Sequence, residues 1–558
     1  MPYRINQYCV CCHYCRMECP ASAINFVGTK YEIDPEKCTE CGLCEKLCPI
    51  SAISNTSLPP EKPEKHELIE LQSDLVVLGA GGSGLISAVR FAQLTGKKVI
   101  VLEKAKKPGG NTNLAHGFMV FNSKWQQDAG IPDFRDDFIR DAMKRVLHKL
   151  DNKIIENAVY ATGPFFDWLC ELGGAEEAFQ LGLGAMDKKM IGYPYRKFAN
   201  LKCRDQAIGP GWAGTYVIRK MLEYCDKLGI KVLTEHKAVK LYRNEQGAIS
   251  GVLAEDPGGQ TKISCSAVVV STGGFGRGDE KLKKYFPEFF AGETPIHRFS
   301  VPTNTGDGMD LGEEIGADIA EKNLCVNMFG PAHHPFGYCG YRIMMQPEVL
   351  YINLNGKRWI DESAGLMDSR YRIAEQPKEI SYAVVDSNIL EIAAQRLIAN
   401  PPDGTDDWIL RDYRQEMEEE LKLDTPLKKG DTLEELALQM GIDPAAFVEE
   451  IKRYNTFCAN GRDDDFLKHP KHLVPVEKPP FYAFYGKRFS EGAFGGLKIN
   501  EKMQVLDKQG RVIPGLYATG DAASANLLRD TLGVISELTW CVSSGYMAGG
   551  NLADSFKK

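Results

Sequence analysis

The chain has 558 residues, of which 43% are hydrophobic, and a formal net charge of −8. The length allows several domains with large packed cores, and the acidic balance does not favour binding to nucleic acid or to an anionic membrane. No apolar run approaches the roughly 18 residues of a membrane span, and the N-terminus has neither an apolar signal core nor a twin arginine. We therefore expect a soluble, cytoplasmic protein, in which the 17 cysteines favour metal sites over disulfides.

Eight of these cysteines form two copies of one pattern near the N-terminus. Each copy reads Cys-x2-Cys-x2-Cys-x3-Cys-Pro, and the second follows the first by 29 positions. The copies use Cys9, Cys12, Cys15 and Cys19, and then Cys38, Cys41, Cys44 and Cys48. This spacing is that of bacterial ferredoxins with two [4Fe–4S] clusters, in which the fourth cysteine of each copy binds the cluster of the other copy.

The spacing therefore predicts two electron-carrying clusters. One would be held by Cys9, Cys12, Cys15 and Cys48, and the other by Cys38, Cys41, Cys44 and Cys19. Two zinc sites are the alternative, although zinc leaves the third cysteine of each copy unexplained.

A dinucleotide-binding βαβ unit is predicted over Ser73–Glu103. The runs Asp74–Leu78 and Val99–Leu102 are short, apolar and β-branched, which is typical of buried strands. Between them, Leu85–Thr95 has the apolar spacing of a helix, and Gly96 stands where that helix should end.

Glycines and an acid complete this unit. Gly79 allows a tight turn, Gly81 lets the backbone approach a pyrophosphate, and Gly84 allows the helix to pack closely on the strand. Glu103, 19 residues after Gly84, suits a ribose hydroxyl and would repel a 2′-phosphate. The motif leaves open which dinucleotide is bound.

Further segments resemble the flavoprotein family of fumarate reductases and succinate dehydrogenases. These segments are Gly109–Thr112, Ser271–Phe275, Thr305–Gly308, Asn355–Glu362, Gly515–Asp521 and Ser544–Gly549. With Ser73–Glu103 they extend the resemblance from Ser73 to the end of the chain. The resemblance implies an α/β fold, in which a Rossmann-type FAD-binding domain carries an inserted α+β capping domain that closes over the isoalloxazine ring.

The expected organisation is as follows. A small ferredoxin-like domain covers residues 1–54, and residues 55–72, which are rich in proline and charge, form a linker. The FAD-binding domain covers residues 73–328 and 485–558, and the capping domain covers 329–484. In the capping domain, Thr432–Cys458 is charged and amphipathic and is expected to be helical, and Arg358 and Glu362, four residues apart, are expected to form a structural ion pair.

The resemblance also implies FAD, with its ADP ribose on Glu103 and its ribityl chain near Asp521. Attachment is expected to be non-covalent, because members with covalent FAD carry a histidine where this chain has Asn111. The expected FAD-binding residues are Gly79, Gly81, Gly82, Ser83, Gly84, Glu103, Lys104, Gly110, Asn111, Thr112, Val239, Thr272, Gly273, Gly274, Asp307, Gly520, Asp521, Val534 and Ile535. We find no second glycine fingerprint for a nicotinamide cofactor, so electrons are expected to arrive through the clusters.

The substrate site departs from the family pattern. In family reductases an arginine protonates the alkene carbon, but the expected position holds Leu366 and the nearest candidate is Arg370. The family's His-Pro-Thr is His334-Pro-Phe, and Tyr338 and Tyr341 add phenols nearby. We therefore assign catalysis to Arg370, His334, Tyr341 and Tyr338, and expect an enoate or enone that is larger or less charged than fumarate.

The sequence thus predicts an anaerobic FAD enzyme that reduces an activated C=C bond. Electrons would pass from a ferredoxin-like or flavodoxin-like donor, or from a partner subunit, through two [4Fe–4S] clusters to FAD, and then as hydride to a small unsaturated substrate. The alternatives are sulfur chemistry like that of adenylylsulfate reductase, an electron-relay subunit, and a dehydrogenase that runs in the reverse direction.

Overall fold

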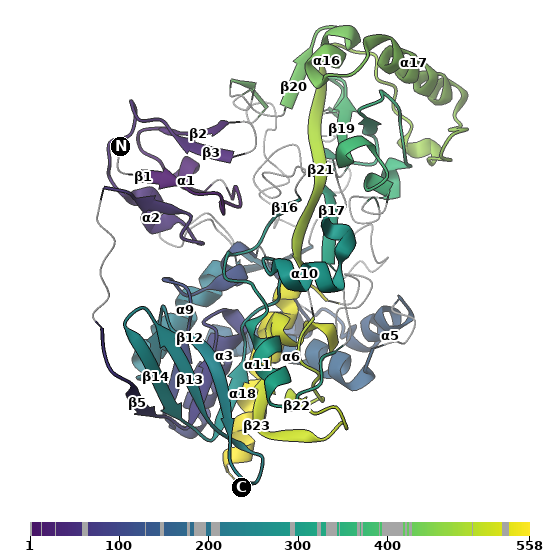
Figure 1. Cartoon of the computed structure of the whole chain (residues 1–558). Coiled ribbons are helices and arrows are strands. Elements are labelled where there is room, and N and C mark those ends of the chain that lie inside the picture. The colour runs from purple at the N-terminus through teal and green to yellow at the C-terminus, as the bar shows by residue number, and fades with distance from the viewer. Residues whose placement is uncertain are drawn as a thin grey trace.

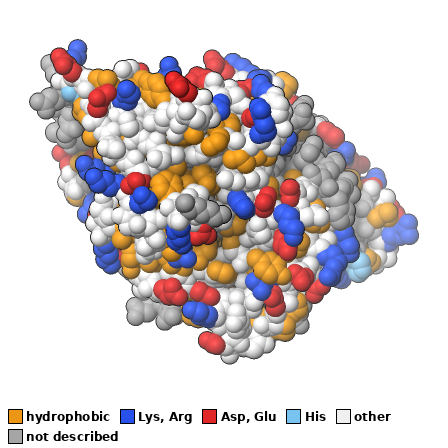
Figure 2. Space-filling view, turned by 90° about the horizontal axis from the view of Figure 1, so that it is seen from below, with side chains coloured by type: hydrophobic (Ala, Val, Ile, Leu, Met, Phe, Trp, Pro, Cys, Tyr) orange, Lys and Arg blue, Asp and Glu red, His pale blue; other side chains and the backbone are white. Residues whose placement is uncertain are grey.

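The structure of the chain is a computed structural model, shown in Figure 1. It describes residues 3–12, 14–27, 30–57, 65–115, 117–128, 130–145, 150–175, 179–183, 197–201, 213–290, 296–320, 325–330, 343–344, 346–364, 369, 372–389, 391–392, 417–418, 421–422, 427–493, 495–526 and 535–557. No helix within these ranges is both long and apolar enough to cross a membrane. On the face in Figure 2, basic and acidic side chains are interspersed with small apolar areas.

The N-terminal domain is a structural duplication. Its elements are β1 (Tyr3–Ile5), α1 (Tyr14–Met17), β2 (Ile24–Val27), β3 (Lys30–Ile33), α2 (Leu43–Leu47) and β4 (Ile53–Asn55). Strand β1 pairs antiparallel with β4, and β2 pairs antiparallel with β3. The 29-residue repeat extends to the backbone, because Cys11 and Glu40 both have positive φ, at 54° and 58°, as do Ser22 and Ser51, at 47° and 54°.

The predicted linker ends in a strand. Residues Ile69–Gln72 form β5, which pairs parallel with β14 (Gly259–Ser264) at the edge of a four-stranded sheet. The expectation of an unstructured linker as far as residue 72 is therefore wrong for its last four residues. Their apolar side chains, Ile69 and Leu71, alternate with polar ones, and this short pattern fits an edge strand.

A six-stranded sheet forms the centre of the large domain, in the order β11-β7-β6-β15-β23-β22. The strands are β6 (Leu75–Leu78), β7 (Val99–Leu102), β11 (Lys231–Leu233), β15 (Ala267–Val270), β22 (Gln504–Leu506) and β23 (Val512–Ala518). All neighbours are parallel except β22, which is antiparallel to β23. The strands predicted at Asp74–Leu78 and Val99–Leu102 are confirmed as β6 and β7, and every residue of both strands is buried.

Helices cover one face of this sheet and a second sheet covers the other. The helices α3 (Gly82–Thr95), α6 (Asn152–Glu171), α9 (Ala213–Lys227) and α18 (Glu537–Phe556) form one layer, in which α3 contacts both α9 and α18. The second sheet comprises β12 (Lys237–Arg243), β13 (Ile249–Asp256), β14 and β5, with β13 against β15 and β23. This layering confirms the predicted Rossmann-type α/β domain.

Smaller elements surround these layers. They are β8 (Phe118–Val120), α4 (Lys124–Asp128), α5 (Arg135–Arg145), β9 (Phe179–Leu183), β10 (Lys197–Leu201), α10 (Asp279–Tyr285), β16 (His297–Arg298) and α11 (Asp307–Glu314). Strands β8, β10 and β9 form a separate antiparallel sheet.

The capping domain is built on one long strand, β21 (Phe481–Ala493), which runs from this domain down to the large domain in Figure 1. It pairs with β16, β17 (Cys325–Gly330), β19 (Ile380–Val385) and β20 (Leu427–Gly430), and β19 pairs with β18 (Leu350–Asn353). The expected boundary between residues 484 and 485 falls within β21, so a single strand belongs to both domains. The helical stretch predicted at Thr432–Cys458 is two helices, α16 (Leu433–Met440) and α17 (Pro444–Asn460), because Gly441 ends the first in a left-handed conformation.

A buried ion network lies inside the capping domain. Arg358 contacts Glu362 at 3.0 Å and Asp463 at 3.0 Å, and Lys468 contacts Glu362 at 3.0 Å. The expected ion pair between Arg358 and Glu362 is thus confirmed as part of a larger set of two cations and two carboxylates. Since these charges neutralise one another and are nearly inaccessible to solvent, they hold the capping domain together rather than meet a ligand.

Candidate functional site

A large cavity opens at the carboxyl ends of the parallel strands of the central sheet. It encloses about 980 Å³ of empty space, and part of it is open to solvent. The expected cofactor residues that line it are Gly79, Gly81, Gly82, Ser83, Glu103, Lys104, Gly110, Asn111, Thr112, Thr272, Gly273, Asp307, Gly520 and Asp521. The carboxyl edge of a doubly wound sheet is where such folds bind nucleotides, so the place and the size suit FAD.

Two glycines of the fingerprint show why no other residue fits. Gly79 has φ of 104°, and a Cβ atom there would lie 2.3 Å from the Ser271 carbonyl oxygen. A Cβ atom on Gly84 would lie 2.1 Å from the Gly79 carbonyl oxygen, so a larger residue would push α3 away from β6. The roles predicted for these two positions, a tight turn and close packing of helix on strand, are confirmed.

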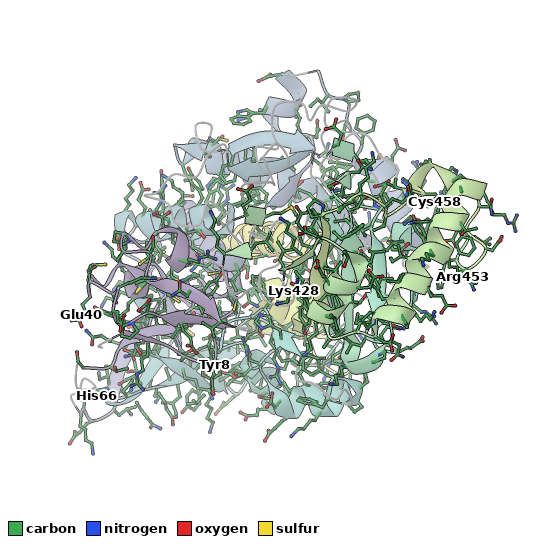
Figure 3. The ribbon with its side chains drawn as sticks, turned by 90° about the horizontal axis from the view of Figure 1, so that it is seen from above. Tyr8, Glu40, His66, Lys428, Arg453 and Cys458 are labelled. Carbon is green, nitrogen blue, oxygen red and sulfur yellow. The ribbon has the colours of Figure 1, made fainter. Side chains whose placement is uncertain are left out.

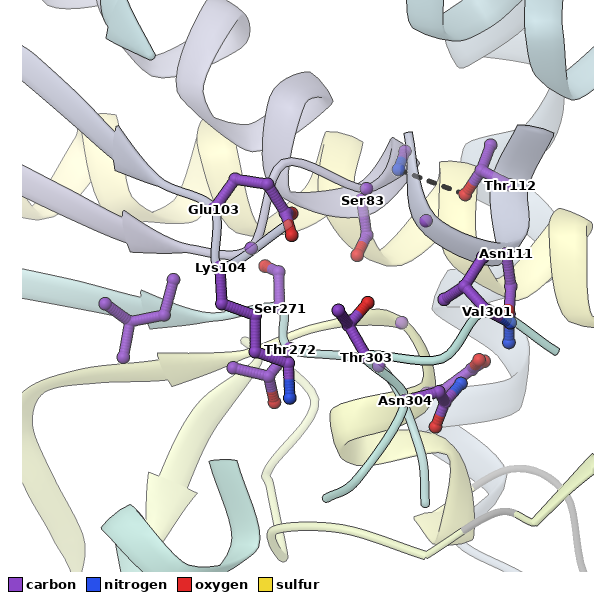
Figure 4. A pocket seen from close by; sticks show the side chains of 18 of the residues that line it. Ser83, Glu103, Lys104, Asn111, Thr112, Ser271, Thr272, Val301, Thr303 and Asn304 are labelled. Carbon is purple, nitrogen blue, oxygen red and sulfur yellow. Dashed lines mark hydrogen bonds between the residues drawn. The ribbon is translucent and has the colours of Figure 1, made fainter. Parts of the chain in front are cut away.

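One end of the cavity combines acids with a lysine (Figure 4). The two carboxylate oxygens of Glu103 accept hydrogen bonds from the Ala80 and Ala105 backbone N–H groups, at 2.9 and 2.8 Å. Lys104 Nζ donates to Thr305 Oγ1 at 2.6 Å and to Asp307 Oδ2 at 2.9 Å. Burial acts to raise the pKa of Asp307, but Lys104 and the Thr305 hydrogen bond outweigh it, so this pKa lies below its ordinary value.

The opposite wall of the cavity is tied together by two side chains of one short turn, the 3-10 turn Gly110–Leu114. Thr112 Oγ1 accepts a hydrogen bond from the Gly82 N–H at 3.0 Å, which is the dashed line in Figure 4. Asn111 Oδ1 accepts a hydrogen bond from the Val301 N–H at 2.8 Å. The Asn111 side chain therefore braces a segment that comes from a distant part of the chain.

A second pair of acids, Asp521 and Glu537, lines the cavity, and no cation among the described residues shifts the pKa of either. Asp521 follows β23, and Glu537 is the first residue of α18. Burial raises the pKa of Asp521 to about 7, and the charge of Glu537 adds to the shift. Burial also raises the pKa of Glu537, whose Oε1 atom has no hydrogen-bond partner.

Some expected residues are placed elsewhere. Gly84, Val239, Gly274 and Ile535 are not among the described residues that line the cavity, and Val534 lies outside the described residues. Gly84 and Gly274 stand one position beyond lining residues, and Val239 follows Ala238, which does line the cavity. The four residues assigned to catalysis, Arg370, His334, Tyr341 and Tyr338, also lie outside the described residues.

Sequence reasoning missed several residues of the wall. They are Leu78, Leu102, Ala115, His236, Lys237, Ala238, Ser271, Val301, Thr303, Asn304, Leu311, Glu537, Leu538 and Cys541. Thr303 and Asn304 directly precede the turn Thr305–Gly308, so the extension of that motif could have found them. Glu537 follows Ser536, which caps α18 through a hydrogen bond from Thr539 N–H, but a helix start alone gives no signal for a cofactor.

The eight motif cysteines form two groups. The inner set is Cys9, Cys12, Cys15 and Cys48, and the outer set is Cys19, Cys38, Cys41 and Cys44. Burial raises the pKa of Cys12 to about 12, and Cys48 and Cys9 add to the shift. Burial likewise raises the pKa of Cys44 to about 11, and Cys38, Cys41 and Cys19 add to it. Each thiol is thus close to the cysteines that the crossed ferredoxin pattern predicts as its companions.

The outer set surrounds a hollow of about 340 Å³ of empty space, lined by all four of its cysteines. A single zinc ion would hold four thiolates at about 2.3 Å. Within the described part of the chain, no three His, Cys, Asp or Glu side chains converge as around one metal ion, and the four cysteines instead line the hollow.

Backbone N–H groups reach several of the cysteine sulfurs. Ala23 N–H donates to Cys19 Sγ at 3.3 Å, and Ala52 N–H donates to Cys48 Sγ at 3.1 Å, at equivalent places of the repeat. Cys11, which was not assigned to a cluster, is buried, and its N–H donates to Cys9 Sγ at 3.4 Å. Hydrogen bonds of this kind stabilise thiolate ligands and raise the reduction potential of a cluster.

Comparison with known proteins identifies the family. The FAD binding domain family matches residues 74–528, and the 4Fe-4S binding domain family matches residues 31–54. The chain therefore belongs to the FAD binding domain family and carries a 4Fe-4S binding domain, and the family relationship and the fusion expected from the sequence are confirmed. The second match spans only one of the two cysteine copies.

Its relatives are reductases. A vinyl phenol reductase of Lactiplantibacillus plantarum is 28% identical over 86% of this chain and 95% of its own length. A urocanate reductase of Eggerthella lenta is 28% identical over 88% of this chain and 76% of its own length. A flavocytochrome c3 fumarate reductase in its open conformation superposes with a TM-score of 0.68 at 24% identity, over 87% of this chain and 78% of that structure, which shows a shared fold. The chain is thus a fumarate-reductase-like flavoenzyme.

Replacement of Gly84 with alanine should remove most of the bound FAD, because the new Cβ atom would overlap the Gly79 carbonyl oxygen and displace α3. Overpacking of this kind costs about 1–3 kcal/mol, so we expect the purified variant to hold about a tenth of the wild-type FAD or less. The ratio of flavin to protein absorbance measures this.

Gly550→Ala is the matched control, since Gly550 also lies in a helix but has no atom within 4 Å of its added Cβ. We expect this variant to keep the wild-type ratio. If both variants kept their FAD, close packing at Gly84 would not be needed for binding.

Proposed function

We propose that this protein is a FAD- and iron–sulfur-dependent reductase of an activated C=C bond. When bound, FAD supplies hydride transfer and the clusters supply one-electron transfer. Support comes from relatives that are named reductases of vinyl phenol, urocanate and acrylate, since each of these compounds has a C=C bond conjugated to an aromatic ring or a carboxylate. The substrate would be an enoate or enone larger or less charged than fumarate.

The proposal places the FAD in the large cavity, bound non-covalently. Glu103 would hold the ADP ribose and the Gly79–Gly84 loop the pyrophosphate, with Asp521 near the ribityl chain. Asn111 stands where covalent members have a histidine, and its side chain is engaged with the Val301 backbone. An amide cannot form the flavin–histidine bond, and this supports non-covalent attachment.

Two [4Fe–4S] clusters, one in each cysteine set, would feed this FAD. The observation that carries this route is the position of Val301. It lines the FAD cavity, and with Phe299 and Leu114 it belongs to the same hydrophobic core as Cys15 and Cys48 of the inner set. The inner cluster would therefore lie next to the wall of the FAD site.

The outer cysteine set would lie on the side of the inner set that is away from the FAD cavity. The described residues that line its hollow all belong to the N-terminal domain, and Cys41 is exposed. Figure 3 places Glu40, beside Cys41, at the outer edge of the molecule, opposite Arg453 and Cys458 of α17. The charge of Cys44 reaches Cys15, so the two sets are neighbours. Electrons from a ferredoxin-like or flavodoxin-like donor, or from a partner subunit, would thus enter at the outer cluster and leave by the inner one.

Proton delivery is proposed for Arg370, with His334, Tyr341 and Tyr338 around the substrate. This assignment rests on the family pattern, in which an arginine close to this position in the sequence acts as the acid. It protonates one carbon of the C=C bond, and the other carbon receives the hydride. A positioned acid is needed because hydride addition leaves negative charge on the conjugated system.

The proposed reaction can be tested by anaerobic reoxidation of the reduced holoenzyme, followed at the flavin absorbance. The panel holds urocanate, cinnamates, vinyl phenols, enone steroids, fumarate and adenylylsulfate. We expect rapid reoxidation by at least one enoate, vinyl phenol or enone, and slower reoxidation by fumarate, together with formation of the saturated product. Reoxidation by adenylylsulfate alone, or by no compound that contains a C=C bond, would contradict the proposal.

Loss of the outer cluster should stop electron transfer from the donor to FAD without stopping electron transfer from FAD to the substrate. Cys44→Ser is expected to lower the iron content from about eight to about four atoms per chain, because each cluster holds four. This variant should lose reduction by a protein donor, but it should keep FAD and its reoxidation by the substrate after chemical reduction. Cys170→Ser, at a half-buried cysteine of α6, is the control and should change neither property. Normal reduction by the donor in Cys44→Ser would contradict entry at the outer cluster.

Arg370→Lys should lower turnover by about 10²-fold or more, because lysine would not place a proton at the same point. FAD and iron contents should stay at wild-type values, which shows that the variant is folded and loaded. Near-normal turnover would exclude Arg370 as the proton donor and would leave Tyr341 and Tyr338 as the candidates for that role.

A further inference from the structure

The acidic residues that line the FAD cavity differ in the charged and hydrogen-bonding groups around them. Asp307 lies 2.9 Å from Lys104 and 3.9 Å from Lys237, and both oxygens of Glu103 accept backbone hydrogen bonds. The two lysines stabilise Asp307 as a carboxylate and lower its pKa, whereas burial outweighs the backbone hydrogen bonds of Glu103 and raises its pKa. The charge of Glu537 adds to the raised pKa of Asp521, and no cation of the described residues contributes to the pKa of either acid.

One carboxyl oxygen of Glu537 is buried without a hydrogen bond to any described residue. This oxygen is Oε1, and it has no hydrogen-bond partner among the described residues, although the side chain lines a cavity that must hold a polar cofactor. An unpaired polar atom in such a place costs free energy until a ligand meets it. A carboxyl group that keeps its proton can donate one hydrogen bond, whereas a carboxylate can only accept.

The charge of the cofactor bears on which form is present. FAD carries a negative pyrophosphate, which in this fold lies at the glycine loop and the N-terminus of the following helix. Ser83 of that loop is close to Gly520, because a Cβ atom on Gly520 would lie 2.5 Å from Ser83 Oγ. Asp521, the next residue, is therefore near the pyrophosphate position, and the approach of negative charge favours neutral carboxyl groups here.

We propose that FAD binds to this chain together with one proton, which the Glu537 carboxyl group holds and donates as a hydrogen bond to an acceptor atom of FAD. The inference rests on FAD binding alone and not on the identity of the substrate. It makes Glu537 a cofactor-binding residue that the glycine fingerprint does not include.

The sign of the pH dependence follows from linkage. If the neutral form binds FAD, the pKa of Glu537 is higher in the complex than in the FAD-free protein. Affinity is then full below the pKa of the free protein and falls as the pH rises through it. One proton gives a tenfold rise in the dissociation constant per pH unit.

Other titratable groups face the same cavity. Asp521 and Cys541 lie on the side of Glu537, and burial raises the pKa of Cys541 to about 12, so this thiol stays neutral. His236 lies on the side of Glu103, with Nδ1 2.7 Å from the Thr234 carbonyl oxygen and Nε2 3.6 Å from Asp256. His236→Gln is therefore the control for this second ionisable side chain of the cavity.

The test is the dissociation constant of FAD for the full chain freed of FAD, measured anaerobically by flavin fluorescence from about pH 6 to about pH 9. We expect the wild-type constant to rise about tenfold per unit in the upper part of this range. Glu537→Gln should bind within about threefold of wild type at the lowest pH and should lose the rise, because the amide also donates. Glu537→Ala should bind about tenfold more weakly at the lowest pH, and His236→Gln should keep the rise.

Three results would overturn the proposal. The first is a wild-type constant that does not change with pH, which needs no variant. The second is a rise that persists in Glu537→Gln. The third is a rise that only Asp521→Asn removes, since the proton would then belong to Asp521. No substrate is present in any arm, so each outcome is independent of whether the enzyme reduces a C=C bond.

Discussion

The hydrogen bond from the Val301 N–H to Asn111 Oδ1, 2.8 Å long, joins the wall of the FAD cavity to the segment that packs against the inner cysteine set. Asn111 belongs to the turn that closes the FAD cavity, and Val301 belongs to the segment that packs into the core of the cysteine domain. The bond therefore fixes the wall between the two sites. Further hydrogen bonds hold the same segment, because the Phe299 N–H donates to the Ser490 carbonyl oxygen at 2.7 Å and Arg277 Nε donates to the Ser300 carbonyl oxygen at 3.0 Å.

Contacts around this wall also anchor the N-terminal domain on the large one. Lys107 Nζ donates to the Glu45 carbonyl oxygen at 2.8 Å, and the Arg277 guanidinium lies 5.9 Å from the centre of the Tyr8 ring. His297, in the strand that runs beside β21, hydrogen bonds with the Val10 backbone and is half-buried. The capping domain, the FAD-binding domain and the cysteine domain thus meet around one small region, which favours a fixed electron route over a loosely tethered donor domain.

The sequence could predict what is encoded in short contiguous patterns. The glycine loop, strands β6 and β7 and the crossed cysteine sets were predictable because their spacing is set by local geometry. The end of the linker was not, because β5 becomes a strand only by pairing with β14, whose paired residues lie 192 positions later in the chain. Val301, His236 and Glu537 were missed for the same reason, since the chain brings them to the cavity from three distant segments. The assignment of the substrate residues depends on the family pattern alone, and this chain departs from that pattern at the substrate site.

The most direct measurement is an anaerobic reductive titration of the holoenzyme, followed by one addition of an excess of the alkene substrate. The account predicts that the chain takes up about four electrons, two on FAD and one on each cluster, and then forms about two molecules of saturated product per chain. All electrons would leave through the flavin, and both clusters would be reoxidised. Formation of only one molecule of product per chain, with the clusters still reduced, would contradict the claim that the cysteine domain and the FAD site form one electron route.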